Sequence, residues 1–140
     1  MSENTASIKV GRLLEIRAEG GYQTTSDVDA IFGAITRELA RLPADAPQHV
    51  TIVDWRRCPL MSPVAAEHML KGIARSNSAT LRSAALARED APTAVMQFVR
   101  LIREANLPDR RLFLDLEELC EWLSEVLTPP EQQRLREFLG

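Results

Sequence analysis

The chain has 140 residues, 45% of them hydrophobic, and a formal net charge of −3, which predicts a single globular domain over residues 1–140 and argues against nucleic acid as a partner. No apolar run approaches the ~20 residues that span a bilayer, and the polar first residues lack the apolar core of a signal peptide, so no integral membrane association is expected. The two cysteines, Cys58 and Cys120, are far apart, which disfavours a disulfide framework and favours a reduced, cytoplasmic, soluble protein.

The hydrophobic pattern predicts an opening hairpin, followed by helices that alternate with strands. Residues 8–10 and 13–18 read as two strands, with Gly11-Arg12 as their turn. The later elements are predicted as a helix over 27–42, a strand over 50–54, a helix over 63–76, a strand over 81–87, a helix over 92–106, a strand over 111–114, a helix after Asp115 and a last helix over 131–139.

Local signals define the ends and the faces of these helices. Thr25 or Ser26 is expected to cap the first helix, and Ser62, which precedes a proline, the second. The third is expected to turn five residues inward, namely Val95, Phe98, Val99, Ile102 and Ala105.

Strands that alternate with helices are expected to be parallel, with right-handed crossovers. The predicted fold is therefore α/β: a mixed sheet, with an antiparallel N-terminal hairpin plus parallel strands, covered by helices. The core spans about residues 8–127, and a C-terminal helix covers about 129–139. The apolar residues of that helix, Leu135, Phe138 and Leu139, must be buried on this domain or on a second copy, so a homo-oligomer through this helix is one expectation.

Two segments resemble the STAS superfamily, and more closely its SpoIIAA-like branch, which is also described with SEC14-type lipid-transfer domains. Residues 50–65 resemble the strand, loop and helix start of STAS domains, and residues 112–123 resemble the strand and helix that close SpoIIAA-like domains. The resemblance covers almost the whole chain. It implies a SpoIIAA-like fold and a small regulatory or scaffolding module that binds other proteins.

The regulatory serine of STAS antagonists is not carried over. The position of that phosphorylated serine holds Val64, which has no hydroxyl group. The family's aspartate position holds Ser62, which keeps the helix-capping role.

The loop after strand 50–54 is the predicted partner-binding site, because α/β domains carry their working groups beyond the carboxyl ends of the strands. Arg56 and Arg57 are expected to supply charge-assisted hydrogen bonds, and Trp55 to supply apolar area. Ser62 and Glu67 extend this surface onto the next helix. The alternative is that one arginine is solvated, the other forms an internal ion pair, and Trp55 covers the edge of the sheet.

No catalytic residue is predicted. Asp54 ends a central strand, as the phosphoacceptor of receiver domains does, but the acidic pair and the lysine that such domains need are absent, so local pairing with Arg56 or Arg57 is the alternative. Ser62 and His68 lie on one helix about 240° apart, which excludes a hydrolase triad with Asp54.

No metal or cofactor site is predicted either. His49, His68 and the two cysteines have no recognised ligand spacing. Cys58 either has a pKa lowered by the neighbouring arginines or is a small filler beside Pro59. The expected function is a non-catalytic protein-interaction module, and the alternative is a protein that binds a small apolar ligand or a lipid.

Overall fold

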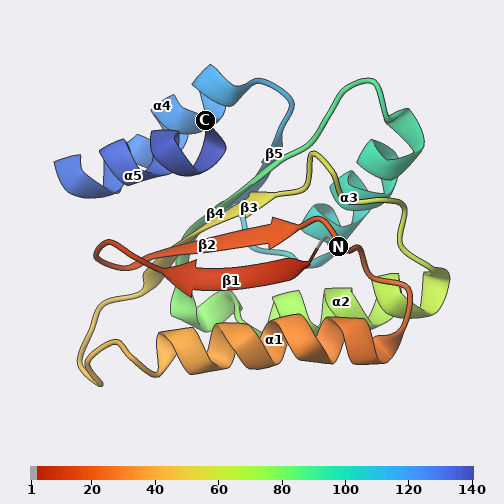
Figure 1. Cartoon of the computed structure of the whole chain (residues 1–140), viewed down its shortest axis with the longest axis horizontal. Coiled ribbons are helices and arrows are strands. Elements are labelled where there is room, and N and C mark those ends of the chain that lie inside the picture. The colour runs from red at the N-terminus through yellow and green to blue at the C-terminus, as the bar shows by residue number, and fades with distance from the viewer. Residues whose placement is uncertain (1–2) are drawn as a thin grey trace.

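The computed structural model describes residues 3–140, which form one five-stranded sheet flanked by helices (Figure 1). The strands are β1 (Asn4–Ile8), β2 (Leu13–Ala18), β3 (His49–Asp54), β4 (Thr80–Leu86) and β5 (Arg110–Phe113). The helices are α1 (Thr25–Leu39), α2 (Pro63–Arg75), α3 (Pro92–Glu104), α4 (Leu116–Ser124) and α5 (Pro129–Leu139), with a short 3-10 turn η1 (Asn77–Ala79).

The strands lie in the order β1-β2-β3-β4-β5, the same as their order in the sequence. β1 runs antiparallel to β2, and each later neighbour is parallel. The predicted mixed α/β sheet is therefore confirmed.

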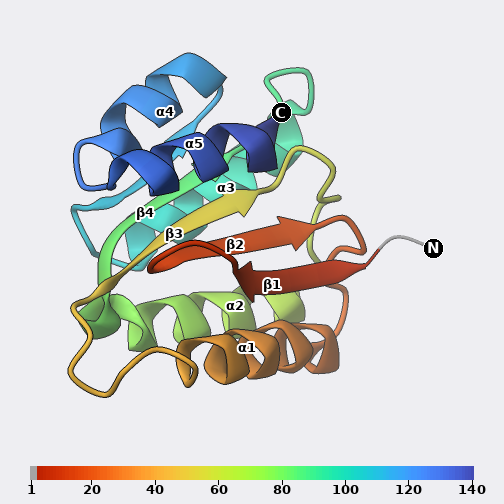
Figure 2. The same ribbon diagram turned by 60° about the vertical axis from the view of Figure 1, so that its left-hand side comes forward.

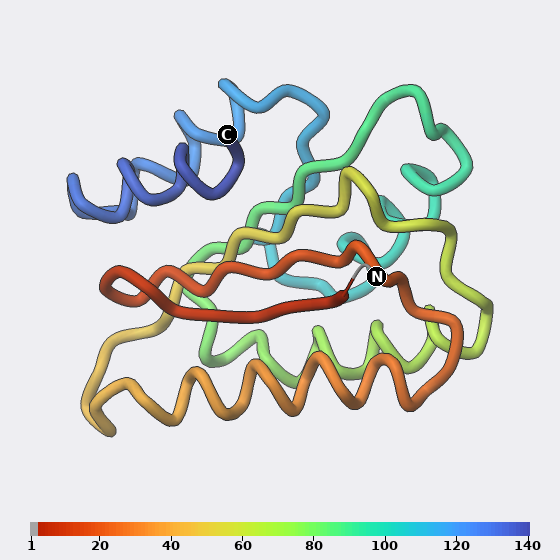
Figure 3. The backbone as a smooth tube through the Cα atoms, viewed as in Figure 1, coloured from red at the N-terminus to blue at the C-terminus, as the bar shows by residue number. Residues whose placement is uncertain are grey.

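Helices cover both faces of the sheet, as parallel strands require. α1, α2 and α3 lie on one face, and α4 and α5 lie on the other (Figure 2). The chain changes face only once, after β5, as the backbone trace shows (Figure 3). Each face therefore has its own apolar core.

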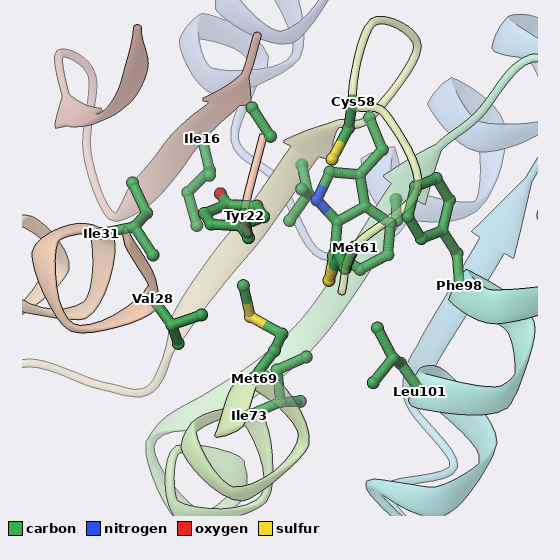
Figure 4. Close-up of a cluster of buried hydrophobic side chains, with 14 of the residues drawn as sticks. Ile16, Tyr22, Val28, Ile31, Cys58, Met61, Met69, Ile73, Phe98 and Leu101 are labelled. Atoms are coloured by element: carbon green, nitrogen blue, oxygen red, sulfur yellow. The ribbon is translucent and has the colours of Figure 1, made fainter. Parts of the chain in front are cut away.

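The core under α1–α3 is the larger of the two. Met69 and Ile73 of α2 point toward the sheet, between Ile31 of α1 and Leu101 of α3 (Figure 4). The strands contribute alternate residues to this core, because successive side chains of a strand point to opposite faces.

The opposite face is closed by α5, which packs against β2. Glu15 of β2 is only 2% exposed, and Arg134 of α5 binds its two carboxylate oxygens at 2.7 and 2.8 Å. The apolar residues of α5 that predicted an interface between copies, Leu135, Phe138 and Leu139, are buried within this domain. The sequence argument for a homo-oligomer through this helix therefore loses its basis.

Three local predictions need correction. The first strand ends at Ile8 rather than beginning there, because Asn4–Ile8 pairs with β2 and residues 9–12 form the turn, with Gly11 at a φ of +57°. The cap of α1 is Thr24, which forms a reciprocal capping box with Asp27. Val99 of α3 is 42% exposed, so it does not face inward as predicted.

Two helical glycines offer a matched test of how α1 and α2 pack. A Cβ on Gly72 would lie 2.4 Å from the Phe32 ring of α1, whereas a Cβ on Gly33 would meet only an arginine nitrogen at 3.5 Å. We expect G72A to lower the free energy of unfolding by about 1–3 kcal/mol through overpacking. G33A should raise it by about 0.5–1 kcal/mol through helix propensity. Urea unfolding measures both, and equal effects would contradict this packing.

Candidate functional site

Asp54 ends β3, and its carboxylate is held between two arginines. Arg17 donates to Oδ2 at 3.1 Å, and Arg56 donates through Nε to Oδ1 at 2.9 Å and through Nη2 to Oδ2 at 3.0 Å. The Asp54 side chain is 10% exposed. The local pairing that the sequence offered as an alternative for Asp54 is therefore present, and the hydrogen bonds that Asp54 accepts raise the pKa of Arg56.

The same two arginines bind the C-terminal end of α5. Arg17 donates to the carbonyl oxygen of Phe138, and Arg56 donates to that of Leu139 at 2.8 Å. The Arg17 guanidinium also lies over the Phe138 ring, 4.2 Å from its centroid. Cationic side chains stabilise helix C-termini because they satisfy the last carbonyl groups. Arg56 is thus bound within the protein rather than presented to a partner.

Trp55 lies inside the core, not in an exposed loop as predicted. It is 4% exposed, and its ring packs on that of Phe98 with centroids 4.6 Å apart. Its backbone N–H donates to the carbonyl of Leu86. Arg57 is different: its side chain is 77% exposed, and its nearest carboxylate is that of Glu19 at 4.0 Å.

Ser62 caps α2, as the sequence predicts. Its hydroxyl oxygen accepts from the Ala65 N–H and donates to the carbonyl of Gln23. Glu67 is exposed on the same helix. The five predicted partner-binding residues therefore do not share one surface; Arg57 and Glu67 are the exposed ones.

The remaining chemistry-bearing residues of this region have structural roles. His68 contacts Asp29 of α1 at 2.7 Å and not Ser62. Cys58 is buried, and burial raises its pKa to about 12, which agrees with the filler interpretation and not with a pKa lowered by the arginines. Within residues 3–140, no group of three His, Cys, Asp or Glu side chains is arranged to hold a metal ion.

A site that the sequence analysis missed lies between the sheet and α1–α3. There the structure has a partly open cavity of about 70 Å³. Apolar side chains form most of its wall, among them Ile16, Phe32, Ile35, Val53 and Met69. The cavity also touches polar groups, which is unusual for a core.

The polar groups form a row across three strands at one end of this cavity. Thr51 pairs with Ser83 in the sheet register, and Ser83 pairs with Arg110. All three residues line the cavity, and each is at most 8% exposed. Two residues further along each strand, the same face carries only apolar residues, Val53, Ala85 and Leu112. The cavity thus has a polar end and an apolar end.

Arg110 is a buried cation whose partners are all neutral. Nε donates to Asn77 Oδ1 at 2.8 Å, and Nη2 donates to the Ile73 carbonyl at 3.1 Å and to Ser76 Oγ at 2.8 Å. No ion pair within residues 3–140 involves Arg110, and burial alone lowers its pKa to about 10. The guanidinium is therefore charged at neutral pH, without a carboxylate beside it.

His49 completes the polar end of the cavity and does not compensate this charge. Burial and the charge of Arg110 lower the pKa of His49 to about 4. At neutral pH its imidazole is uncharged, so the polar end carries the single positive charge of Arg110.

The sequence does hold a signal for this site. Thr51 lies in a strand that is buried along its whole length, and Ser83 begins the buried stretch of β4. Polar residues at such positions are hydrogen-bonded or line a site. Arg110 gives no such signal in the sequence, because two consecutive arginines at the start of a strand normally lie in solvent.

Comparison with known proteins identifies the fold and no function. No protein-family model matches the chain, and no curated protein matches its sequence. A solved structure of an uncharacterised DUF3478-family protein with a SpoIIAA-like fold, from Shewanella loihica PV-4, is similar to this chain. The two superpose with a TM-score of 0.60 and are 19% identical, and the match covers 88% of this chain and 97% of that chain. The SpoIIAA-like fold suggested by the sequence is therefore confirmed.

The described residues contain no helix with the length and apolar character needed to cross a membrane.

The Asp54 cluster can be tested against an exposed ion pair. We expect D54A to lower the free energy of unfolding by about 2–3 kcal/mol, because it leaves two partly buried arginines unpaired and loosens the end of α5. D90A removes the partner of Arg88, where both side chains are more than half exposed, and should leave stability unchanged. Chemical unfolding measures the stability of both variants. Similar losses of stability would mean that Asp54 contributes no more than an exposed ion pair.

Proposed function

We propose that this protein is a non-catalytic module that binds a small, largely apolar molecule in the cavity between the sheet and α1–α3. The observation that supports this function is the cavity itself, which combines an apolar wall with a polar end. Ligand sites of proteins have this composition: mostly apolar side chains and a few polar groups that orient the ligand.

The unused polar groups distinguish this cavity from a packing defect. Among residues 3–140, the hydroxyl groups of Thr51 and Ser83 make no hydrogen bond to a protein atom. Every fully buried side-chain oxygen or nitrogen in these residues has a hydrogen-bond partner, so these two hydroxyl groups are not fully buried. Both hydroxyl groups therefore face the open space of the cavity. A buried hydroxyl without a partner costs about 1–3 kcal/mol, which a ligand or water in the cavity offsets.

The volume of the cavity limits the ligand. Its 70 Å³ is about half of the ~150 Å³ that holds a benzene molecule. The unexpanded cavity therefore takes a tail of only a few carbon atoms. A longer tail requires Phe32, Ile35 or Leu39 of α1 to move away from the sheet.

Two neighbouring alanines provide a matched test. Ala85 lines the cavity, whereas Ala84 points to the opposite core. We expect A85V to reduce the binding of xenon and of 1-butanol at least about tenfold, and to keep or raise the stability because it fills a void. A84V should overpack its core, lower the stability by about 1–3 kcal/mol and leave binding unchanged.

Xenon and 1-butanol binding is measured by NMR on the methyl groups of Ile16 and Ile35, which line the cavity. Native mass spectrometry of the purified protein shows whether a molecule is retained. A protein that carries no added mass and whose methyl signals respond to neither probe would overturn the proposal.

A second candidate, a protein-interaction module, is favoured by the apolar side chains exposed around the start of α2. Leu60 is 47% exposed, Val64 58% and Met96 of α3 74%. Met61 and Gln97 exchange two hydrogen bonds of 2.9 Å, which hold this loop against α3. The exposed Arg57 lies on the same loop and Glu67 is exposed on α2, so these two residues of the predicted surface remain available.

The test of this second function is a double variant, R57E with V64E. A stoichiometric protein partner should be lost from this variant and retained by R75E, which reverses an exposed charge at the far end of α2. Affinity purification followed by native mass spectrometry measures both. A partner that binds the double variant as tightly as the natural chain would exclude this surface.

A further inference from the structure

We infer that the ligand of this cavity is a short-chain carboxylic acid whose carboxylate pairs with Arg110 while its tail lies along the apolar wall; this inference rests on the proposed binding function. Arg110 is 8% exposed and lines the cavity, and its hydrogen-bond partners are a side-chain amide, a backbone carbonyl and two hydroxyl oxygens. A guanidinium in such surroundings is matched by a carboxylate, because charge-assisted hydrogen bonds are stronger than those to neutral acceptors.

One arm of this guanidinium is available to a ligand. Nε and Nη2 are used by Asn77, Ile73 and Ser76, which close the end of α2. Within residues 3–140, no hydrogen bond from Nη1 to a protein oxygen is found. The two used nitrogens fix the orientation of the fork, and Nη1 remains for an anion.

The hydroxyl groups beside Arg110 complete the binding site for an anionic head group. Ser83 is the cross-strand partner of Arg110, and Thr51 is the partner of Ser83. Both hydroxyls face the cavity without a protein acceptor or donor. Hydroxyl groups donate to a carboxylate, so the row Thr51, Ser83 and Arg110 offers donors from three neighbouring strands.

A route for an anion leads to this row from the surface. A groove between α3 and β5 shares Ile102 and Arg110 with the cavity, so these two side chains separate the groove from the interior. The groove is also lined by Arg103 and Arg111 and by no acidic residue. A positive rim of this kind attracts anions from solution.

The length of the tail follows from the cavity volume. About 70 Å³ accommodates a tail of only a few carbon atoms, as in butyrate, once the carboxylate lies at the polar end. Longer acids should bind progressively more weakly, because they must displace side chains of α1.

The experiment compares sodium butyrate and sodium hexanoate with 1-butanol and 1-hexanol at neutral pH, by NMR titration of the Ile16 and Ile35 methyl groups. We expect each acid to bind about tenfold to a hundredfold more tightly than the alcohol of equal length, because a hydrogen-bonded charge is stronger than a neutral contact. An acid that binds no more tightly than its alcohol overturns the inference and leaves the proposed function standing. Probes that leave all methyl signals unchanged overturn both.

Three variants locate the binding. R110Q should abolish the advantage of the acids over the alcohols. Because Arg110 also closes the end of α2, R110Q risks failing to fold, and T51V is the second test. The Thr51 hydroxyl makes no hydrogen bond to a protein atom within residues 3–140, so T51V should fold while acid binding falls severalfold. R103Q is the control, since it removes a charge from the rim only.

An acid affinity that T51V leaves unchanged, or that R103Q reduces as much as R110Q does, would place the anion on the surface of the groove and overturn the inference. A loss with T51V and with folded R110Q, but not with R103Q, would support it.

Discussion

The packing of α5 against the sheet depends on the carboxylate of Asp54. It lies at the carboxyl end of the central strand and orients Arg17 and Arg56 so that both reach the last carbonyl groups of α5. A single side chain thus connects the sheet, the loop after β3 and the C-terminal helix. The edge at which α/β domains commonly bind their ligands is, in this chain, occupied by an internal ion cluster.

Most of the architecture was predictable because periodicity, helix caps and turn residues agree with one another along the chain. The antiparallel direction of the first hairpin and the parallel direction of the later strands were predicted on this basis. β1 was misplaced because Asn4 to Ser7 are mostly polar residues of an edge strand, whose place in the sheet is decided by pairing with β2 and not by an apolar pattern. The exposure of Val99 depends on the exact rotation of α3, which a helical repeat does not define.

The candidate site was less predictable, because it depends on contacts between distant elements. Trp55 was expected at the surface, yet Phe98 of α3 supplies a partner that draws it into the core. Arg110 directly precedes the predicted strand 111–114 and was given no role, whereas in the structure it belongs to β5 and donates to the end of α2. The arginine and tryptophan residues of a loop show which side chains could bind a partner. Tertiary packing decides which of those side chains stay exposed. Violations of local pattern, such as Thr51 and Ser83 inside apolar strands, are the better guide to a site.

The closure of α5 onto the first hairpin has a consequence for how the chain folds. The bonds from Arg134 to Glu15, and from the Arg12 backbone N–H to Glu131, join residues 119 positions apart. During synthesis on the ribosome, one side of the hairpin consequently stays uncovered until the last helix emerges, whereas α1 covers the other side early. Such non-local closure slows folding, and the nascent chain exposes apolar surface at Leu13 and Val50 for most of its synthesis.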